Sequence, residues 1–99
     1  MEISKTTENG TLTLKVAGRL DTNTSPQLEA ELPGEDGGIK EIVFDFTGLY
    51  YISSAGLRVL IMAQKRLAAT GGKAKIRGAN DMVRGVLDMT GLSTILGME

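Results

Sequence analysis

Two adjacent serines, Ser53 and Ser54, stand where a predicted strand gives way to a predicted helix. A helix start concentrates unpaired backbone N–H groups and the positive end of the helix dipole, so a hydroxyl held there can carry a phosphate at low electrostatic cost. A serine at this place is also a common N-cap, and residue type alone favours that plainer role. The pair therefore offers either helix capping or a phosphorylatable switch.

Other kinds of chemistry are limited by the composition, because the 99 residues include no histidine and no cysteine. Without imidazole or thiol there is no Ser-His triad, no histidine or thiolate metal ligand and no cysteine nucleophile. The run Ser54-Ala55-Gly56 resembles part of a nucleophile elbow, but that motif needs glycine where Ile52 stands. Gly71-Gly72-Lys73 lacks the upstream glycine and the following Ser or Thr of a phosphate-binding P-loop. We therefore expect no enzyme, no metal and no cofactor.

The length and charge restrict the class of partner. A chain of 99 residues makes one small domain, and its net charge of −1 gives no electrostatic case for nucleic acid. The longest apolar run, residues 59–63, is too short to cross a bilayer, and residues 1–10 have no apolar signal-peptide core. We therefore expect a cytoplasmic domain that does not bind nucleic acid directly and does not insert into membranes.

Strand patterns occur in three places. An alternating hairpin is predicted over residues 2–7 and 11–16, with Asn9-Gly10 supplying the positive φ angles of its turn. Residues 39–46 are apolar on both faces, as in the middle of a covered parallel sheet, and residues 73–77 alternate as a short strand.

Helix patterns also occur in three places. The first begins at Thr24, which with Gln27 fits a capping box, and ends at Pro33-Gly34. The second covers residues 54–69, and the third runs from Asn80 or Asp81 to Thr90-Gly91. In the second helix the core positions are Leu57, Leu60, Ile61, Leu67 and Ala68. The methionines are expected mainly as core filling at Met82 and Met89, with Met62 a partly exposed apolar spot among Arg58, Lys65 and Arg66.

The order of these elements is β, β, α, β, α, β, α, followed by an apolar end. Strands that alternate with helices predict the α/β class: a mixed, mainly parallel sheet that starts with an antiparallel hairpin and is covered by helices. In such sheets the functional residues usually lie at the carboxyl ends of strands, where the chain enters a helix, and Ser53 and Ser54 lie at such a place. The small residues Ala55 and Gly56 beside them would let a partner's backbone come close.

Four segments of the chain resemble STAS domains in order and spacing. They are residues 18–21 (GRLD), the strand over residues 42–46, residues 51–57 (YISSAGL) and residues 87–92 (LDMTGL). STAS domains include the anti-sigma factor antagonists and the related domain of sulfate transporters. The resemblance covers nearly the whole chain, and the serine loop and the DMTGL segment are its most specific parts.

The resemblance implies a partner switch. A free antagonist binds an anti-sigma factor that is also a serine kinase of the GHKL type, which releases the sigma factor; phosphorylation of the antagonist then dissociates the complex. Carried over by position, Ser54 is the phosphate acceptor and Asp21 lies in a neighbouring loop of the partner surface. The residues expected to bind the partner are Asp21, Thr22, Ser53, Ser54, Ala55, Gly56, Leu57, Arg58 and Met62.

Two departures from the family pattern leave alternatives open. Many antagonists have aspartate immediately before the acceptor, where this chain has Ser53, so Ser53 is a second candidate acceptor. Family members usually continue into a C-terminal helix, and the chain ends at Glu99, so that helix is expected to be absent or truncated. The protein is expected to be a monomer or a weak dimer. Its alternative roles are an unphosphorylated STAS subunit of an ABC-type lipid transport complex, or a scaffold component of a signalling assembly.

Overall fold

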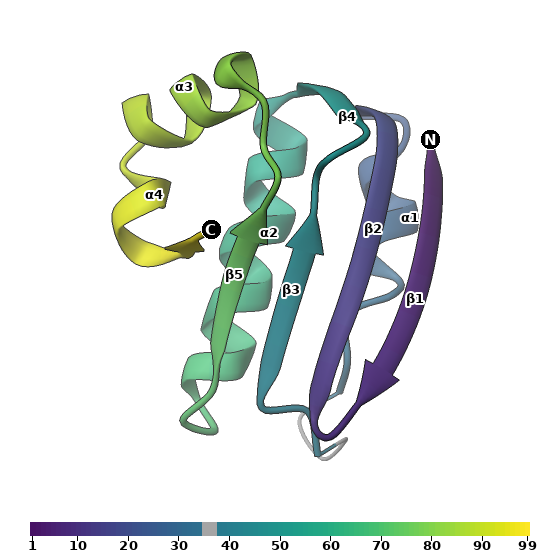
Figure 1. Ribbon diagram of the computed structural model, residues 1–99, viewed down its shortest axis with the longest axis vertical. Helices are drawn as coiled ribbons and strands as arrows, with labels where there is room; N and C mark the ends of the chain where they lie inside the picture. Colours follow the sequence, from purple (N-terminus) through teal and green to yellow (C-terminus); the bar gives the residue numbers. More distant parts are fainter. Residues whose placement is uncertain (35–37) are drawn as a thin grey trace.

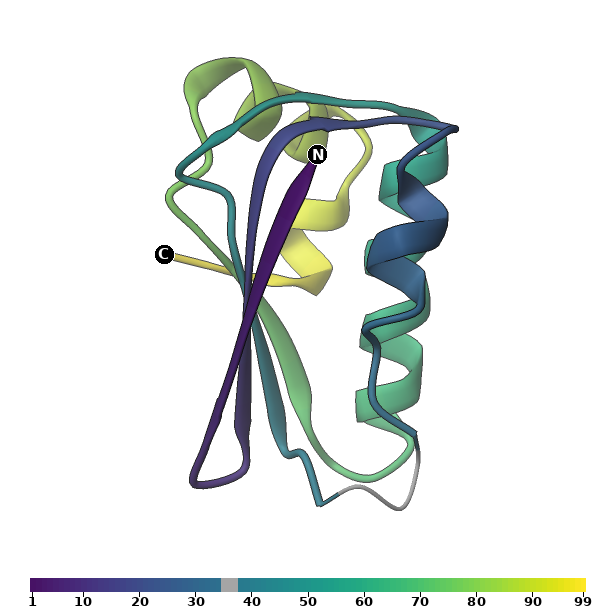
Figure 2. The same ribbon diagram turned by 90° about the vertical axis from the view of Figure 1, so that its right-hand side faces the viewer.

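A mixed β-sheet carries helices α1 and α2 on one of its sides, as Figure 1 and, seen along the sheet, Figure 2 show. The computed structural model describes residues 1–34 and 38–99. The order of hydrogen-bonded strands is β1-β2-β3-β5-β6, and β4 pairs with β2 off that path. The strands are β1 Glu2–Glu8, β2 Thr11–Leu20, β3 Glu41–Asp45, β4 Leu49–Ile52, β5 Lys73–Arg77 and β6 Gly97–Met98. The helices are α1 Ser25–Glu29, α2 Ser54–Ala68, α3 Asp81–Met89 and α4 Leu92–Ile95.

The strand directions confirm the predicted α/β class. β1 and β2 are antiparallel, and the turn between them has Asn9 at φ 50° and Gly10 at φ 81°, the two positive angles that a tight hairpin turn requires. All other strand pairs of the described sheet are parallel. The predicted hairpin and the central position of β3, between β2 and β5, are therefore confirmed.

The strand β2 is longer than predicted because it has two successive neighbours. Residues 11–15 pair with β3, and residues 18–20 pair with β4 after a register shift between Gly18 and Arg19. Gly18, at φ 98°, donates its N–H to Gly48 O at 2.9 Å across this shift. The sequence prediction ended this strand at residue 16 and contained no β4, and both points are wrong.

The core lies between the sheet and the helices. Alternate residues of the three central strands point into it: Leu12, Leu14, Val16, Ile42, Phe44, Ala74 and Ile76, all buried. Helix α2 adds Val59, Leu60, Ala63 and Leu67 from one side. The predicted core positions Ile61 and Ala68 are wrong, because both lie on the outward side of α2 and are exposed.

The first helix differs most from its prediction. It spans only Ser25–Glu29, and its N-cap Thr24 makes no side-chain capping bond, so the predicted capping box is wrong. The Thr24 hydroxyl instead donates to Arg19 O at 2.8 Å and accepts from the Asp21 N–H at 2.9 Å, which closes the loop after β2. The predicted second and third helices match α2 and α3 to within one residue, with Asn80 as the N-cap of α3. Within the described chain, none of the helices has the length and apolarity needed to span a membrane.

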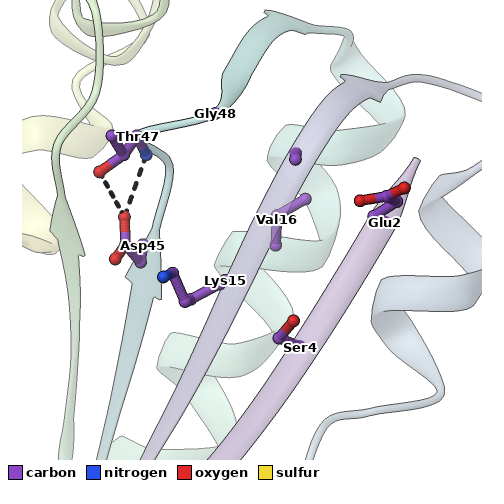
Figure 3. A pocket seen from close by; sticks show the side chains of 8 residues that line it. Glu2, Ser4, Lys15, Val16, Asp45, Thr47 and Gly48 are labelled. Carbon is purple, nitrogen blue, oxygen red and sulfur yellow. Dashed lines mark hydrogen bonds between the residues drawn. The ribbon is translucent and has the colours of Figure 1, made fainter.

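The turn that carries the chain from β3 to β4 is fixed by Asp45, the last residue of β3. Its Oδ1 accepts hydrogen bonds from the Thr47 hydroxyl at 2.6 Å and the Thr47 N–H at 3.0 Å, drawn as dashed lines in Figure 3. Its Oδ2 accepts from Arg77 Nη2 on β5 at 3.2 Å. The Thr47 hydroxyl, helped by the Thr47 N–H and by Arg77, outweighs burial and holds the pKa of the Asp45 carboxyl below its ordinary value. Asp45 therefore helps to position β4 and, through β4, the serine loop.

Replacing Asp45 by asparagine is expected to lower the free energy of unfolding by about 1.5 kcal/mol at neutral pH. The hydrogen bonds from Thr47 and Arg77 would then go to a neutral acceptor, which binds them more weakly than a carboxylate. Because the pKa of Asp45 is lower in the folded than in the unfolded protein, the carboxylate stabilises the fold above its unfolded pKa. That contribution is lost as the pH falls through the folded pKa. Urea unfolding at pH ~7 and pH ~3 should therefore show a wild-type advantage over Asp45→Asn that shrinks in acid.

The matched control for this measurement is Asp88→Asn, at an exposed aspartate of α3. Its difference from wild type should be small, because no hydrogen bond to the Asp88 side chain occurs within the described residues. An Asp45→Asn variant as stable as wild type at neutral pH would contradict the positioning role.

Candidate functional site

The serine loop lies at the edge of the sheet where β2 and β4 both end. The Ser53 N–H donates to Leu20 O at 2.9 Å, and Leu20 pairs with Ile52 in the parallel register of these strands. The loop after Leu20, which holds Asp21 and Thr22, therefore leaves the sheet beside the serine loop (Figure 1). The structure thus brings together two of the segments that the sequence analysis placed on one surface.

Ser53 is the N-cap of α2. Its backbone is extended, at φ −102° and ψ 175°, and its Oγ accepts from the Gly56 N–H at 3.4 Å. The Ser53 carbonyl accepts the first helical hydrogen bond, from the Leu57 N–H at 3.0 Å. The side chain is half-buried and already has a structural role, since a capping oxygen satisfies one of the free N–H groups of the helix start.

Ser54 is the first residue of α2, and its side chain is exposed. In the part of the chain that the structure describes, no hydrogen bond involves its hydroxyl. The two adjacent serines therefore differ in kind: Ser53 caps the helix, and Ser54 presents a free hydroxyl in its first turn.

Asp21 is held by its own loop. Its Oδ1 accepts from the Asn23 N–H at 2.9 Å and the Thr24 N–H at 3.0 Å, and its Oδ2 lies 3.5 Å from Arg19 Nε. The Thr24 N–H is the main reason why the pKa of Asp21 lies below its ordinary value. The Arg19 guanidinium also lies 4.1 Å from the centre of the Tyr51 ring on β4. These contacts order the loop next to the serines and stabilise the charged form of its carboxylate.

An apolar groove runs between α2 and the region of α4, and Ser54 lies on its wall. It encloses about 420 Å³ and is lined by Ser54, Leu57, Arg58, Ile61, Thr90, Leu92 and Ile95. Ile61 is 38% exposed and Ile95 is 58% exposed, so apolar side chains are open to solvent here. Exposed apolar surface with a polar edge is typical of protein interaction sites. We call these seven residues the α2–α4 groove.

The other residues of the predicted partner surface lie in different places. Leu57 and Arg58 line the groove, and Ala55 is half-buried beside it. Gly56 is buried: a Cβ added to it would lie 2.7 Å from Leu20 Cγ, so its expected use for close approach of a partner is wrong. Met62 lies outside the groove and packs partly against the core, with Arg66 Nη2 3.8 Å from its sulfur.

The sequence analysis missed four residues of the groove, namely Ile61, Thr90, Leu92 and Ile95. Ile61 had a usable signal, because the spacing of residues 54, 58 and 61 places it on the same helical face as Ser54. The other three depend on how α4 packs, which has no local signal. Met82 and Met89 are 57% and 86% exposed, so their predicted role as core filling is wrong.

Comparisons with known proteins identify the family of the chain. The sequence profile of the STAS domain matches residues 2–99. The protein BtrV of Bordetella bronchiseptica is 33% identical to this chain, with 96% of this chain and 83% of BtrV covered. An anti-sigma-B factor antagonist of Staphylococcus aureus is 29% identical, with 97% of this chain and 90% of that protein covered.

Among solved structures, the phosphorylated form of the Bacillus cell fate determinant SpoIIAA superposes with a TM-score of 0.80. The superposition covers 99% of this chain and 91% of SpoIIAA, at 19% identity, so it supports the fold. The profile match, the sequence relatives and the fold lead to one conclusion: the chain belongs to the STAS domain family.

Proposed function

We propose that this protein is an anti-sigma factor antagonist, a binding protein and not an enzyme, which is switched off by phosphorylation of Ser54. Its partner is an anti-sigma factor of the GHKL kinase type, which binds the α2–α4 groove and the neighbouring Asp21 loop. The antagonist role is supported by the S. aureus relative, which is named an anti-sigma-B factor antagonist and matches this chain over 90% of its own length. Solved structures of SpoIIAA in unphosphorylated and phosphorylated forms support the modification in that protein.

The observation that carries the choice of acceptor is the free, exposed hydroxyl of Ser54 beside the groove. In the proposed reaction, Ser54 Oγ forms a bond to the γ-phosphorus of ATP as the bond between that phosphorus and the β–γ bridging oxygen breaks. ADP leaves, and the hydroxyl proton passes to a base of the kinase. The helix start tolerates the product because it favours negative charge.

The modification acts on the groove by electrostatics. A phosphate adds about −1.5 to −2 charges beside Leu57, Ile61 and Ile95. A partner that fills an apolar groove would have to cover this charge, and burying an unpaired charge is costly. The phosphorylated protein therefore releases its partner, which is then free to hold the sigma factor.

Phosphopeptide mapping tests the proposal directly. The protein is used to capture its partner from an extract of its host; the purified partner is then incubated with ATP and with wild type, Ser53→Ala or Ser54→Ala. We expect one modified site in wild type and in Ser53→Ala, and none in Ser54→Ala. Modification of Ser53, modification elsewhere, or no modification by a partner that binds would contradict the proposal.

A further inference from the structure

Among the residues that the structure describes, Arg58 is the only charged one that lines the α2–α4 groove. Its side chain is exposed, and within the same described residues no carboxylate lies within ion-pair distance of it. Helix α2 carries Arg58, Lys65 and Arg66 and has no acidic residue between Ser54 and Ala68. The groove therefore has an uncompensated positive charge set in an apolar wall.

Ser54 and Arg58 lie four positions apart on the same helix, and both line the groove. Side chains at this spacing are neighbours on a helix surface, with Cβ atoms about 5–6 Å apart. The planar guanidinium presents several N–H donors, which bind phosphate oxygens through charge-assisted and often paired hydrogen bonds. A phosphate on Ser54 is thus within reach of the Arg58 guanidinium.

We propose that Arg58 binds the phosphate on Ser54 and in this way couples phosphorylation to release of the partner. In the unmodified protein its guanidinium pairs with a carboxylate of the docked partner, whose apolar side chains fill the groove. In the phosphorylated protein the guanidinium binds the phosphate on Ser54 instead, so the partner loses its ion pair while the groove gains net negative charge. This inference rests on the proposed function. It adds the chemistry of the partner segment that docks in the groove, which has apolar side chains and a carboxylate.

The pairing of Arg58 with the phosphate is tested without any partner. Phosphoserine is installed at position 54 during translation, and the pKa of its second ionisation is measured from the ³¹P chemical shift as a function of pH. Four backgrounds are compared at low salt: wild type, Arg58→Gln, Arg58→Lys and, as a matched control, Lys65→Gln. Lys65 is an exposed cation of the same helix that does not line the groove.

Arg58 should lower the pKa of the phosphate, so Arg58→Gln should raise it by about 0.3 or more, the size expected for a helical ion pair one turn apart. Lys65→Gln should leave it unchanged, and Arg58→Lys should restore most of the difference. The helix start, Asp21 and Arg19 act alike in all four proteins, and the residues that α4 adds to the groove, Leu92 and Ile95, are uncharged. Equal pKa values in wild type and Arg58→Gln would overturn the pairing.

Binding of the unmodified proteins to the captured kinase tests the other half of the proposal. Arg58→Gln is expected to weaken binding about tenfold, and Lys65→Gln is expected to leave it within about twofold. Equal affinities of wild type and Arg58→Gln would overturn the ion pair with the partner. The two proposals fail separately: an unchanged phosphate pKa refutes the role of Arg58, whereas phosphoserine at position 54 with no effect on kinase binding refutes the switch itself.

Discussion

Replacing Ser54 by aspartate is expected to weaken binding of the partner at least ~30-fold while leaving thermal stability nearly unchanged. The loss corresponds to about 2 kcal/mol, the lower end of what the loss of an interfacial charge pair costs, because the new carboxylate competes with the partner for Arg58 and adds negative charge to the groove. The fold should tolerate the change, because Ser54 is exposed, its hydroxyl makes no hydrogen bond in the described structure, and it stands where a helix favours an acidic residue. Calorimetric titration with the captured kinase measures the first effect, and a thermal melt measures the second.

The matched control is Ser4→Asp, which adds the same charge at an exposed serine of β1. Ser4 lies in a hollow lined by residues of β1, β2 and the end of β3, among them Lys15 and Asp45 (Figure 3). Its substitution changes the net charge by the same amount at a distance from the groove, so it should bind like wild type. If both variants bound the partner equally weakly, the overall charge of the protein, and not the position of Ser54, would explain the effect. Unfolding of Ser54→Asp would instead make Ser54 a packing residue.

The elements that the sequence predicted well are those whose signals are local. β5 has its predicted limits because alternation and the preceding Gly71-Gly72 define a short strand, and α3 begins at a capping asparagine whose Oδ1 accepts from the Val83 N–H at 2.8 Å. By contrast, β4 is four residues long and forms its ladder with the far end of β2, well back in the chain. Alternation over so short a segment gives no pattern that distinguishes it from a loop.

The site shows the same division between local and distant information. The position of Ser54 at a helix start followed from its neighbours, whereas the place of Leu57 and Arg58 on the same surface came only from the resemblance to STAS domains. The groove followed from neither, because one wall is built by Leu92 and Ile95 of a short helix near the end of the chain. The capping role of Ser53 rather than Ser54 depended on where the first helical turn begins, and sequence places such limits only to within a few residues.

Gly56 gives the second large expected effect. It stands in the first turn of α2, and a Cβ added there would lie 2.7 Å from Leu20 Cγ and 2.9 Å from Ile52 Cγ1. These two residues end β2 and β4, so the contact is where the helix start rests on the strands that carry the Asp21 and serine loops. Gly56→Ala is expected to lower the free energy of unfolding by about 1–3 kcal/mol, the usual cost of overpacking a core. Urea unfolding measures it.

Gly85→Ala is the matched control, because Gly85 is also a helical glycine, but a Cβ added to it would have no described atom within 4 Å. Alanine is the better helix former by about 0.8–1 kcal/mol, so this variant should be more stable than wild type. Glycine-to-alanine substitution is thus expected to lower the free energy of unfolding at Gly56 and to raise it at Gly85, and the difference depends on packing alone. A stabilising Gly56→Ala would show that the helix start can move away from β2 and β4 without cost. A destabilising one, with weaker binding of the kinase, would show that the fold accepts a poor helix former in order to hold Ser54 close against the ends of these strands.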